Sequence, residues 1–158
     1  MPGALVTHGR GMLWLAWTVE VDILAPAATV WALLTNAEGF PRWNSTVTRI
    51  DGRIAEGQRL RLHVPGTERT FTPTVTDVVP LERMSWIGGI APLFKGVRRF
   101  TLTVSNEGAT KFSMAERFSG LMVPLAARAM PDLGPVFERF ALDLKREAEG
   151  NRTSTEAR

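Results

Sequence analysis

Alternation of apolar and polar residues predicts that most of the chain is β-strand. From Trp17 to Leu24, the apolar residues Trp17, Val19, Val21 and Ile23 alternate with polar ones, which is typical of a strand with one buried face. Turn residues separate further short strands, predicted at 46–50, 60–64, 70–79, 84–87, 94–104 and 111–118. Short turns join antiparallel neighbours, so the pattern indicates one antiparallel sheet of about six to seven strands.

Helical spacing appears in two places. Ala25-Pro26 ends the first strand, and a short helix that begins at Pro26, with Val30, Trp31, Leu33 and Leu34 at helical spacing, is predicted to stop at Asn36 and Gly39. The run 40–43 is predicted as a second short helical piece or a turn. After Gly120 the chain becomes helical again, with breaks expected at Pro131 and Gly134-Pro135. The long C-terminal helix has an apolar stripe of Phe137, Phe140, Ala141, Leu144 and Ala148, and a polar face of Glu138, Arg139, Asp143, Arg146 and Glu147.

This order of elements predicts an α+β fold. A sheet with one apolar face must be covered, and the C-terminal helix is the only long amphipathic element in the sequence. Residues 1–10 show no periodicity and are expected to be a flexible leader, and 150–158 a disordered polar tail. Residues 11–149 then form a single domain.

Composition excludes several classes of chemistry. The 158 residues include no cysteine, no tyrosine and two histidines, so thiolate nucleophiles, disulfides and cysteine metal sites are ruled out. The glycines do not have the spacing of a phosphate-binding loop. We expect neither a metal nor a cofactor.

Charge and hydropathy narrow the expected partners and location. The net charge of +3 comes from scattered basic residues, whereas a nucleic-acid binder shows a basic stripe. We therefore expect no nucleic-acid partner. The most apolar early stretch, 12–17, is far shorter than the ~20 residues of a membrane span. We expect no integral membrane segment and a cytoplasmic location.

The run from Val21 to Leu34, with Ala25-Pro26 ahead of Val30-Trp31, is similar to the opening of START-like proteins. Phe40-Pro41-Arg42-Trp43 and the late run 109–120 before a long helix resemble the same superfamily, also called SRPBCC, over about 17–149. That superfamily includes the polyketide cyclase/dehydrase and lipid transport group. The resemblance implies the helix-grip fold, in which a curved sheet grips a long helix around an apolar cavity. It also implies a ligand such as a lipid or polyketide.

Two charged residues are predicted to point into this interior. Glu116 shares a strand face with Phe112, Met114 and Phe118, where a carboxylate is costly unless it is paired. Arg98 shares the phase of Phe100 on the preceding strand, and the short turn makes the two strands neighbours. Arg98 and Glu116 are therefore candidate catalytic or ligand-binding residues. The alternatives are a purely structural ion pair, or Arg99 facing inward in place of Arg98.

The predicted ligand cavity lies under the helix that carries Phe137, Phe140 and Leu144. Its expected ligand-binding residues are Trp43, Leu62, Phe71, Val75, Trp86, Arg98, Phe100, Phe112, Met114, Glu116, Met122 and Phe137. Few polar groups face inward, which favours binding or transport of a small apolar molecule. The alternatives are a cyclase or dehydratase acting through Glu116 and Arg98, and an interaction subunit with a vestigial pocket.

Overall fold

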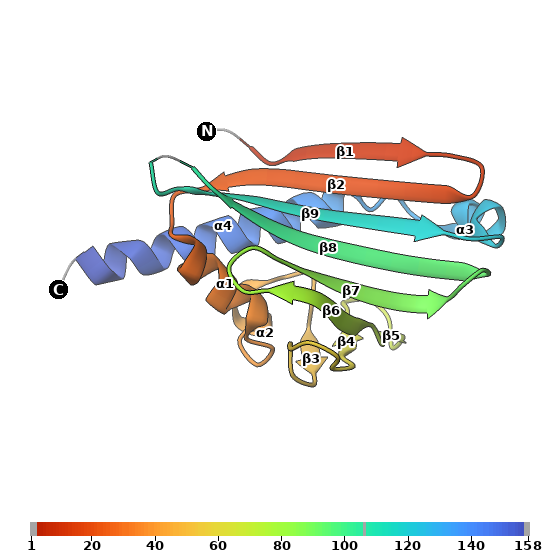
Figure 1. The fold of residues 1–158 in the computed structure, drawn as a ribbon, viewed down its shortest axis with the longest axis horizontal. Coiled ribbons are helices and arrows are strands. Elements are labelled where there is room, and N and C mark those ends of the chain that lie inside the picture. Colours follow the sequence, from red (N-terminus) through yellow and green to blue (C-terminus); the bar gives the residue numbers. More distant parts are fainter. Residues whose placement is uncertain (1–2, 106, 157–158) are drawn as a thin grey trace.

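The computed structural model describes residues 3–105 and 107–156, with side chains to residue 150. One antiparallel sheet lies against a long helix, and shorter elements close one edge (Figure 1). The elements are β1 (Leu5–Arg10), β2 (Trp14–Ile23), α1 (Ala27–Thr35), α2 (Phe40–Trp43), β3 (Arg49–Asp51), β4 (Arg61–His63), β5 (Thr70–Phe71), β6 (Thr74–Val79), β7 (Arg83–Ile90), β8 (Phe94–Val104), β9 (Thr110–Ser119), α3 (Val123–Ala129) and α4 (Gly134–Glu156).

The strands form two sheets rather than the single sheet that was predicted. Six strands pair in the order β1-β2-β9-β8-β7-β6, and β3-β4-β5 form a second, three-stranded sheet. The predicted strand 70–79 is divided into β5 and β6 around Pro73, because proline has no N–H to donate to a ladder. The main-chain N–H of Leu60 donates to the carbonyl of Pro73 at 2.8 Å, which joins the two sheets.

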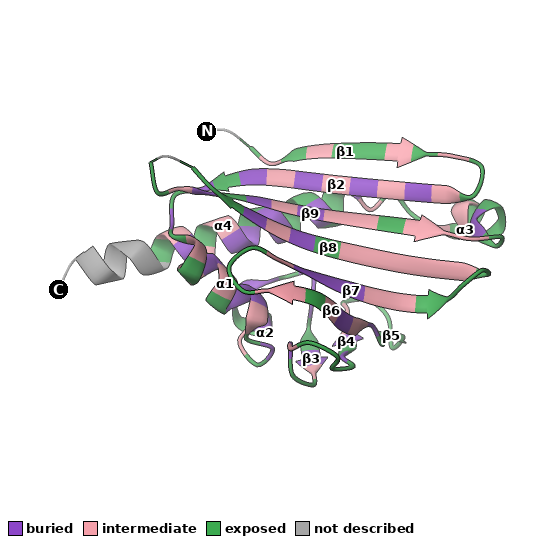
Figure 2. Ribbon diagram, viewed as in Figure 1, coloured by how far each residue is buried: buried purple, intermediate pink, exposed green. Residues whose placement is uncertain are grey.

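The predicted inner and outer faces are confirmed. In β2, buried residues alternate strictly with more exposed ones, and β9 does the same from Thr110 to Met114 (Figure 2). The apolar stripe of α4 lies against this inner face. Its five residues are at most 1% exposed: Phe137, Phe140, Ala141, Leu144 and Ala148. The helix therefore closes the core, as its spacing predicted.

Both predicted chain ends need correction. Residues 5–10 form β1, which pairs with β2 from Leu5↔Glu20 to Arg10↔Leu15, so this part of the leader is structured. An edge strand at this position buries little on either face, which is why it shows no alternation in the sequence. At the other end, α4 continues to Glu156 where a polar tail was expected. Residues 157 and 158, like 1, 2 and 106, lie outside the described residues.

Two side chains lie on the opposite side from the one predicted. Phe71 is 55% exposed rather than inward, because β5 is two residues long at the edge of the small sheet. Asp143 is 5% exposed rather than on the polar face of α4. Its Oδ2 accepts hydrogen bonds from the Ser45 main-chain N–H at 2.8 Å and the Ser45 hydroxyl at 2.7 Å, which compensates its burial.

None of the helices in the described residues combines the length and the hydropathy that a membrane crossing requires.

Candidate functional site

Arg98 and Glu116 form an ion pair on the inner face of the sheet. They are directly opposite in the β8–β9 register, and the guanidinium donates from Nε at 2.9 Å and from Nη2 at 2.5 Å to the same carboxylate oxygen, Oε2. The Arg98 and Glu116 side chains are 21% and 14% exposed. The Arg99 side chain extends from the outer face of the sheet, where its Nη2 lies 3.0 Å from Oδ2 of Asp77. The predicted pairing, and the choice of Arg98 over Arg99, are confirmed.

The pair is enclosed by aromatic side chains. The guanidinium carbon of Arg98 lies 5.3 Å from the ring centre of Phe137 on α4, a cation–π distance. Trp86 on β7 is the register partner of Arg98, and Trp17 on β2 is that of Glu116. Oε1 of Glu116 and Nη1 of Arg98 make no hydrogen bond to the described residues. The pair is therefore held in place while keeping one acceptor and one donor group unused.

An aromatic cluster continues from this pair toward α2. Ring centres lie 4.7 Å apart for Phe40 and Trp43, and 4.8 Å apart for Trp86 and Phe100. Phe140 stacks on Phe112 at 6.1 Å. Offset and edge-on arrangements at these separations are favourable. The six rings, Phe40, Trp43, Trp86, Phe100, Phe112 and Phe140, come from α2, three strands and α4.

Two hydrogen-bond donors inside this cluster have no acceptor. The indole Nε1 atoms of Trp43 and Trp86 are buried without a hydrogen-bond partner among the described residues, as is Nδ2 of Asn44, the residue after Trp43. A buried, unpaired donor costs roughly 1–3 kcal/mol. Such groups need an explanation in a native fold, and a ligand oxygen would satisfy them.

The structure brings together most of the predicted ligand-binding residues. Eight of them are buried in the apolar core: Trp43, Leu62, Val75, Trp86, Phe100, Phe112, Met114 and Phe137. Phe71 and Met122 are 55% and 42% exposed and lie outside this group. The predicted cavity among the buried residues stays a prediction. Two pockets of the structure lie elsewhere.

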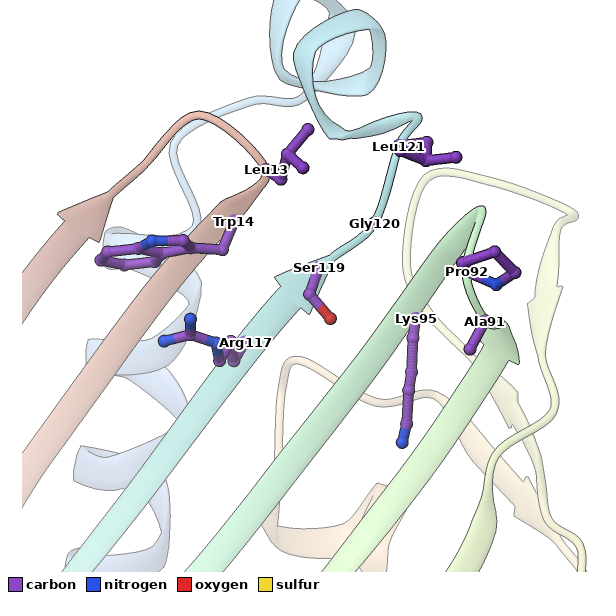
Figure 3. Close-up of a pocket in the computed structure, with 9 residues that line it drawn as sticks. All are labelled: Leu13, Trp14, Ala91, Pro92, Lys95, Arg117, Ser119, Gly120 and Leu121. Atoms are coloured by element: carbon purple, nitrogen blue, oxygen red, sulfur yellow. The ribbon is translucent and has the colours of Figure 1, made fainter.

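The first pocket lies on the outer face, at the end of the sheet next to α3 (Figure 3). Its volume is about 430 Å³, and its polar wall is Lys95, Arg117 and Ser119. Trp14 forms another wall, with the guanidinium carbon of Arg117 4.4 Å from its ring centre. Sequence reasoning missed this pocket because its residues are spread over three strands. Alternation along each strand indicated that these residues share the outer face. It did not indicate that they lie at the same end of the sheet.

The second pocket, about 350 Å³, lies at the β1 edge and is bordered by His8, Trp17 and Asp132. Oδ1 of Asp132 accepts hydrogen bonds from the Gly134 N–H at 2.9 Å and from Nε1 of Trp17 at 3.1 Å. Both hydrogen bonds lower the pKa of Asp132 below its ordinary value, and the bond from Gly134 has the larger effect. Asp132 thereby fixes the start of α4 against the sheet.

The small sheet carries a separate polar cluster. Asp51 lies between Arg49 and His63, with Nε of Arg49 at 2.6 Å and Nε2 of His63 at 2.9 Å from its carboxylate oxygens. The hydrogen bond from Arg49 and, to a smaller extent, the hydrogen bond from His63 lower the pKa of Asp51 to about 2. Among the described residues, no group of three or more His, Asp or Glu side chains is arranged to hold a metal ion.

Comparison with known proteins supports the fold and the family. The profile of the family described as "Polyketide cyclase / dehydrase and lipid transport" matches residues 16–149. No curated protein shows a significant sequence match.

Solved structures are similar along most of the chain. A START superfamily protein from Mycobacterium smegmatis is 20% identical with a TM-score of 0.65, covering 86% of this chain and 98% of that one. A protein from Mesorhizobium loti is 25% identical with a TM-score of 0.64 and the same coverage. The di-domain ARO/CYC StfQ of the steffimycin biosynthetic pathway is 13% identical with a TM-score of 0.72. The match covers 89% of this chain and 53% of StfQ, about half of that protein.

Proposed function

Because the chain belongs to the polyketide cyclase/dehydrase and lipid transport family, we propose that it binds a small apolar ligand between the inner face of the sheet and α4. The ligand would contact the aromatic cluster and carry an oxygen that reaches the polar groups there. Apolar sites with a few placed polar groups are the usual form of small-molecule sites.

The observation that carries this proposal is the Arg98–Glu116 pair. It is the inward-facing ion pair of β8 and β9, and both of its hydrogen bonds use Oε2. Arg98 keeps Nη1 for a ligand carbonyl or carboxylate, and a guanidinium presents its donors in a fixed plane. The unpaired Nε1 atoms of Trp43 and Trp86 supply two more donors. The ligand class that fits is an apolar molecule with a carbonyl, hydroxyl or carboxyl group.

A second candidate function is proton transfer on such a ligand, as in a cyclase or dehydratase. The free Oε1 of Glu116 favours it, because a general base needs an accessible lone pair within reach of the substrate. In this reading Arg98 orients the carboxylate and polarises the ligand oxygen. Glu116→Gln would then keep ligand binding and lose turnover.

Binding is tested with two probes, decanoate as a lipid-like acid and a naphthol as a polyketide-like aromatic alcohol. Tryptophan emission reports binding, because Trp43 and Trp86 lie in the proposed site. We expect wild type to bind at least one probe and Arg98→Met to bind it at least tenfold more weakly, about 1.4 kcal/mol. Native mass spectrometry of freshly purified protein should show whether a molecule co-purifies.

Arg99→Met is the matched control, since it removes the same group from the next residue but on the outer face. It should leave probe binding unchanged. Wild type that binds neither probe and carries no co-purified molecule would contradict the proposal. Equal losses in Arg98→Met and Arg99→Met would show that the ion pair is not the anchor.

A further inference from the structure

Three turns meet at the α3 end of the sheet and form one surface, here called the tip: residues 10–14, 90–95 and 119–128. Main-chain hydrogen bonds join them, from Gly120 N to Leu13 O at 3.0 Å, Leu121 N to Pro92 O at 3.0 Å and Met122 N to Leu93 O at 2.9 Å. Gly120 has φ +131°, and a Cβ there would lie 2.3 Å from the Leu93 carbonyl oxygen. The close joining of the turns therefore depends on glycine.

The tip exposes an unusual number of large apolar side chains. Seven of them are 41–85% exposed: Met12, Leu13, Ile90, Leu93, Leu121, Met122 and Leu125. They come from all three turns and from α3, which lie together at one end of the molecule (Figure 1). Scattered exposed apolar residues are ordinary, but a patch of this kind marks an interaction surface.

The positive charge of the protein is concentrated at the same end. Segments 9–17, 88–98 and 116–134 contain five basic and two acidic residues, whereas the rest of the chain contains 14 of each. Glu116 is paired with Arg98, and Asp132 is turned toward Trp17 and Gly134. The four other basic residues have no carboxylate partner among the described residues: Arg10, Lys95, Arg117 and Arg128.

The outer pocket opens beside these apolar side chains. Leu13 and Leu121 form its wall toward the tip, and Lys95, Arg117 and Ser119 form its polar side (Figure 3). Trp14 lies flat over the turn at Gly11, where a Cβ would meet the indole Nε1 at 2.0 Å. Two cations, a hydroxyl and an indole are thus fixed next to an apolar surface.

We propose that the tip docks on membranes that contain anionic phospholipid, with its apolar side chains between the headgroups and a lipid phosphate in the outer pocket. Apolar residues surrounded by cations are the form of an interfacial membrane anchor, and each basic residue near an anionic surface strengthens binding by about fivefold. A second copy of the chain fits less well, because a two-fold contact would place the same unpaired cations against each other. This inference goes beyond the proposed function, since the docking residues lie outside the proposed ligand site.

Flotation with vesicles tests the proposal. Wild type should bind vesicles of phosphatidylcholine with about one-third phosphatidylglycerol at least tenfold more tightly than pure phosphatidylcholine vesicles, and salt should weaken the binding. Arg117→Glu should reduce binding about tenfold. Its control is Lys111→Glu, the same charge change on the same face of β9 at the other end of the strand, which should have little effect.

Leu121→Glu with Leu125→Glu should also reduce vesicle binding at least tenfold, and Leu142→Glu on the exposed side of α4 is its control. Thermal unfolding checks that each variant is folded. Wild type that does not bind anionic vesicles overturns the proposal, as does equal weakening by tip and control variants. A dimer in light scattering that Leu121→Glu dissociates would assign the surface to a second copy instead. Arg98→Met should keep vesicle binding, so that failure of the ligand proposal and of this one can be told apart.

Discussion

At the α2 end of the inner face, six aromatic rings pack with centres at most 6.5 Å apart where they contact, and five of the six residues are at most 2% exposed. At the α3 end, the same sheet carries a half-buried ion pair, two pockets and seven exposed large apolar side chains. Figure 2 shows the change along β8, from buried residues near α1 to intermediate ones near α3.

This difference separates an end of the molecule that mainly stabilises the fold from an end that is open to contact with another surface. Apolar area removed from water stabilises a fold by about 25 cal/mol per Å², and the α2 end removes nearly all of it. The α3 end leaves apolar area and unpaired cations in solvent, where they add little to stability. Such exposed groups are available to contact another surface. Substitution should therefore lower the stability of the fold more at the α2 end than at the α3 end.

The largest effect is expected for Phe140→Ala at the α2 end. Phe140 is 1% exposed and contacts four other rings of the cluster, so the truncation should lower the free energy of unfolding by about 3–5 kcal/mol. Leu125→Ala at the tip, where the side chain is 62% exposed, should change it by less than about 0.5 kcal/mol. Urea unfolding measures both. Similar losses at the two positions would remove the distinction between the ends.

Asp143→Ala should cost about 2–3 kcal/mol, because it removes the acceptor of the Ser45 N–H and hydroxyl. The Arg146 partner is 76% exposed and loses little. Arg146→Ala is therefore the control, with an expected change below about 0.5 kcal/mol. If the two variants unfold at the same urea concentration, the buried carboxylate does not hold α4 to the loop after α2.

Arg98→Met should destabilise the fold by about 1–2 kcal/mol, because it leaves the Glu116 carboxylate half-buried without a partner. The double variant Arg98→Met with Glu116→Met should recover most of that loss, since an apolar pair can replace an ion pair. A double-mutant cycle by thermal unfolding measures the coupling. A double variant less stable than the single one would mean that the pair itself stabilises the α3 end.

The smallest expected effect is the loss of stability at acidic pH. The pKa of Asp51 in the folded state is about 2, below the ordinary value of 3.8, and the pKa of Asp132 is also lowered. Groups with depressed folded-state pKa values stabilise the fold above their unfolded pKa. Their contribution is lost as pH falls through the folded value.

Stability should therefore fall between about pH 4 and pH 2, and His63→Ala should raise the pKa of Asp51. Carboxyl carbon chemical shifts in an NMR titration follow each group. An Asp51 midpoint near 4 would contradict the prediction. For Asp132, the titration at the α3 end should coincide with a change at the Trp17 indole N–H, because that N–H donates to the same carboxylate.

Much of the candidate site could be predicted from alternation alone. Glu116 and Arg98 lie in phase with buried neighbours on their own strands, and one short turn joins those strands. The stripe of α4 was likewise visible, because a helical period of 3.6 residues is local. Phe71 could not be placed, since its strand is two residues long and lies at the edge of a small sheet that the sequence did not predict. Asp143 could not be placed either, because its partner Ser45 is 98 residues away.

The sequence by itself determined the α+β class, the faces of the long strands, the helix that covers them and the inward ion pair. Tertiary structure decided that residues 5–10 form an edge strand, that the strands divide into two sheets, and that three distant turns form the tip. The physical reason is the range of the interactions. Periodicity and turn preference act over a few residues. The tip, in contrast, depends on hydrogen bonds between residues 12–14, 90–94 and 119–123, which no local pattern brings together.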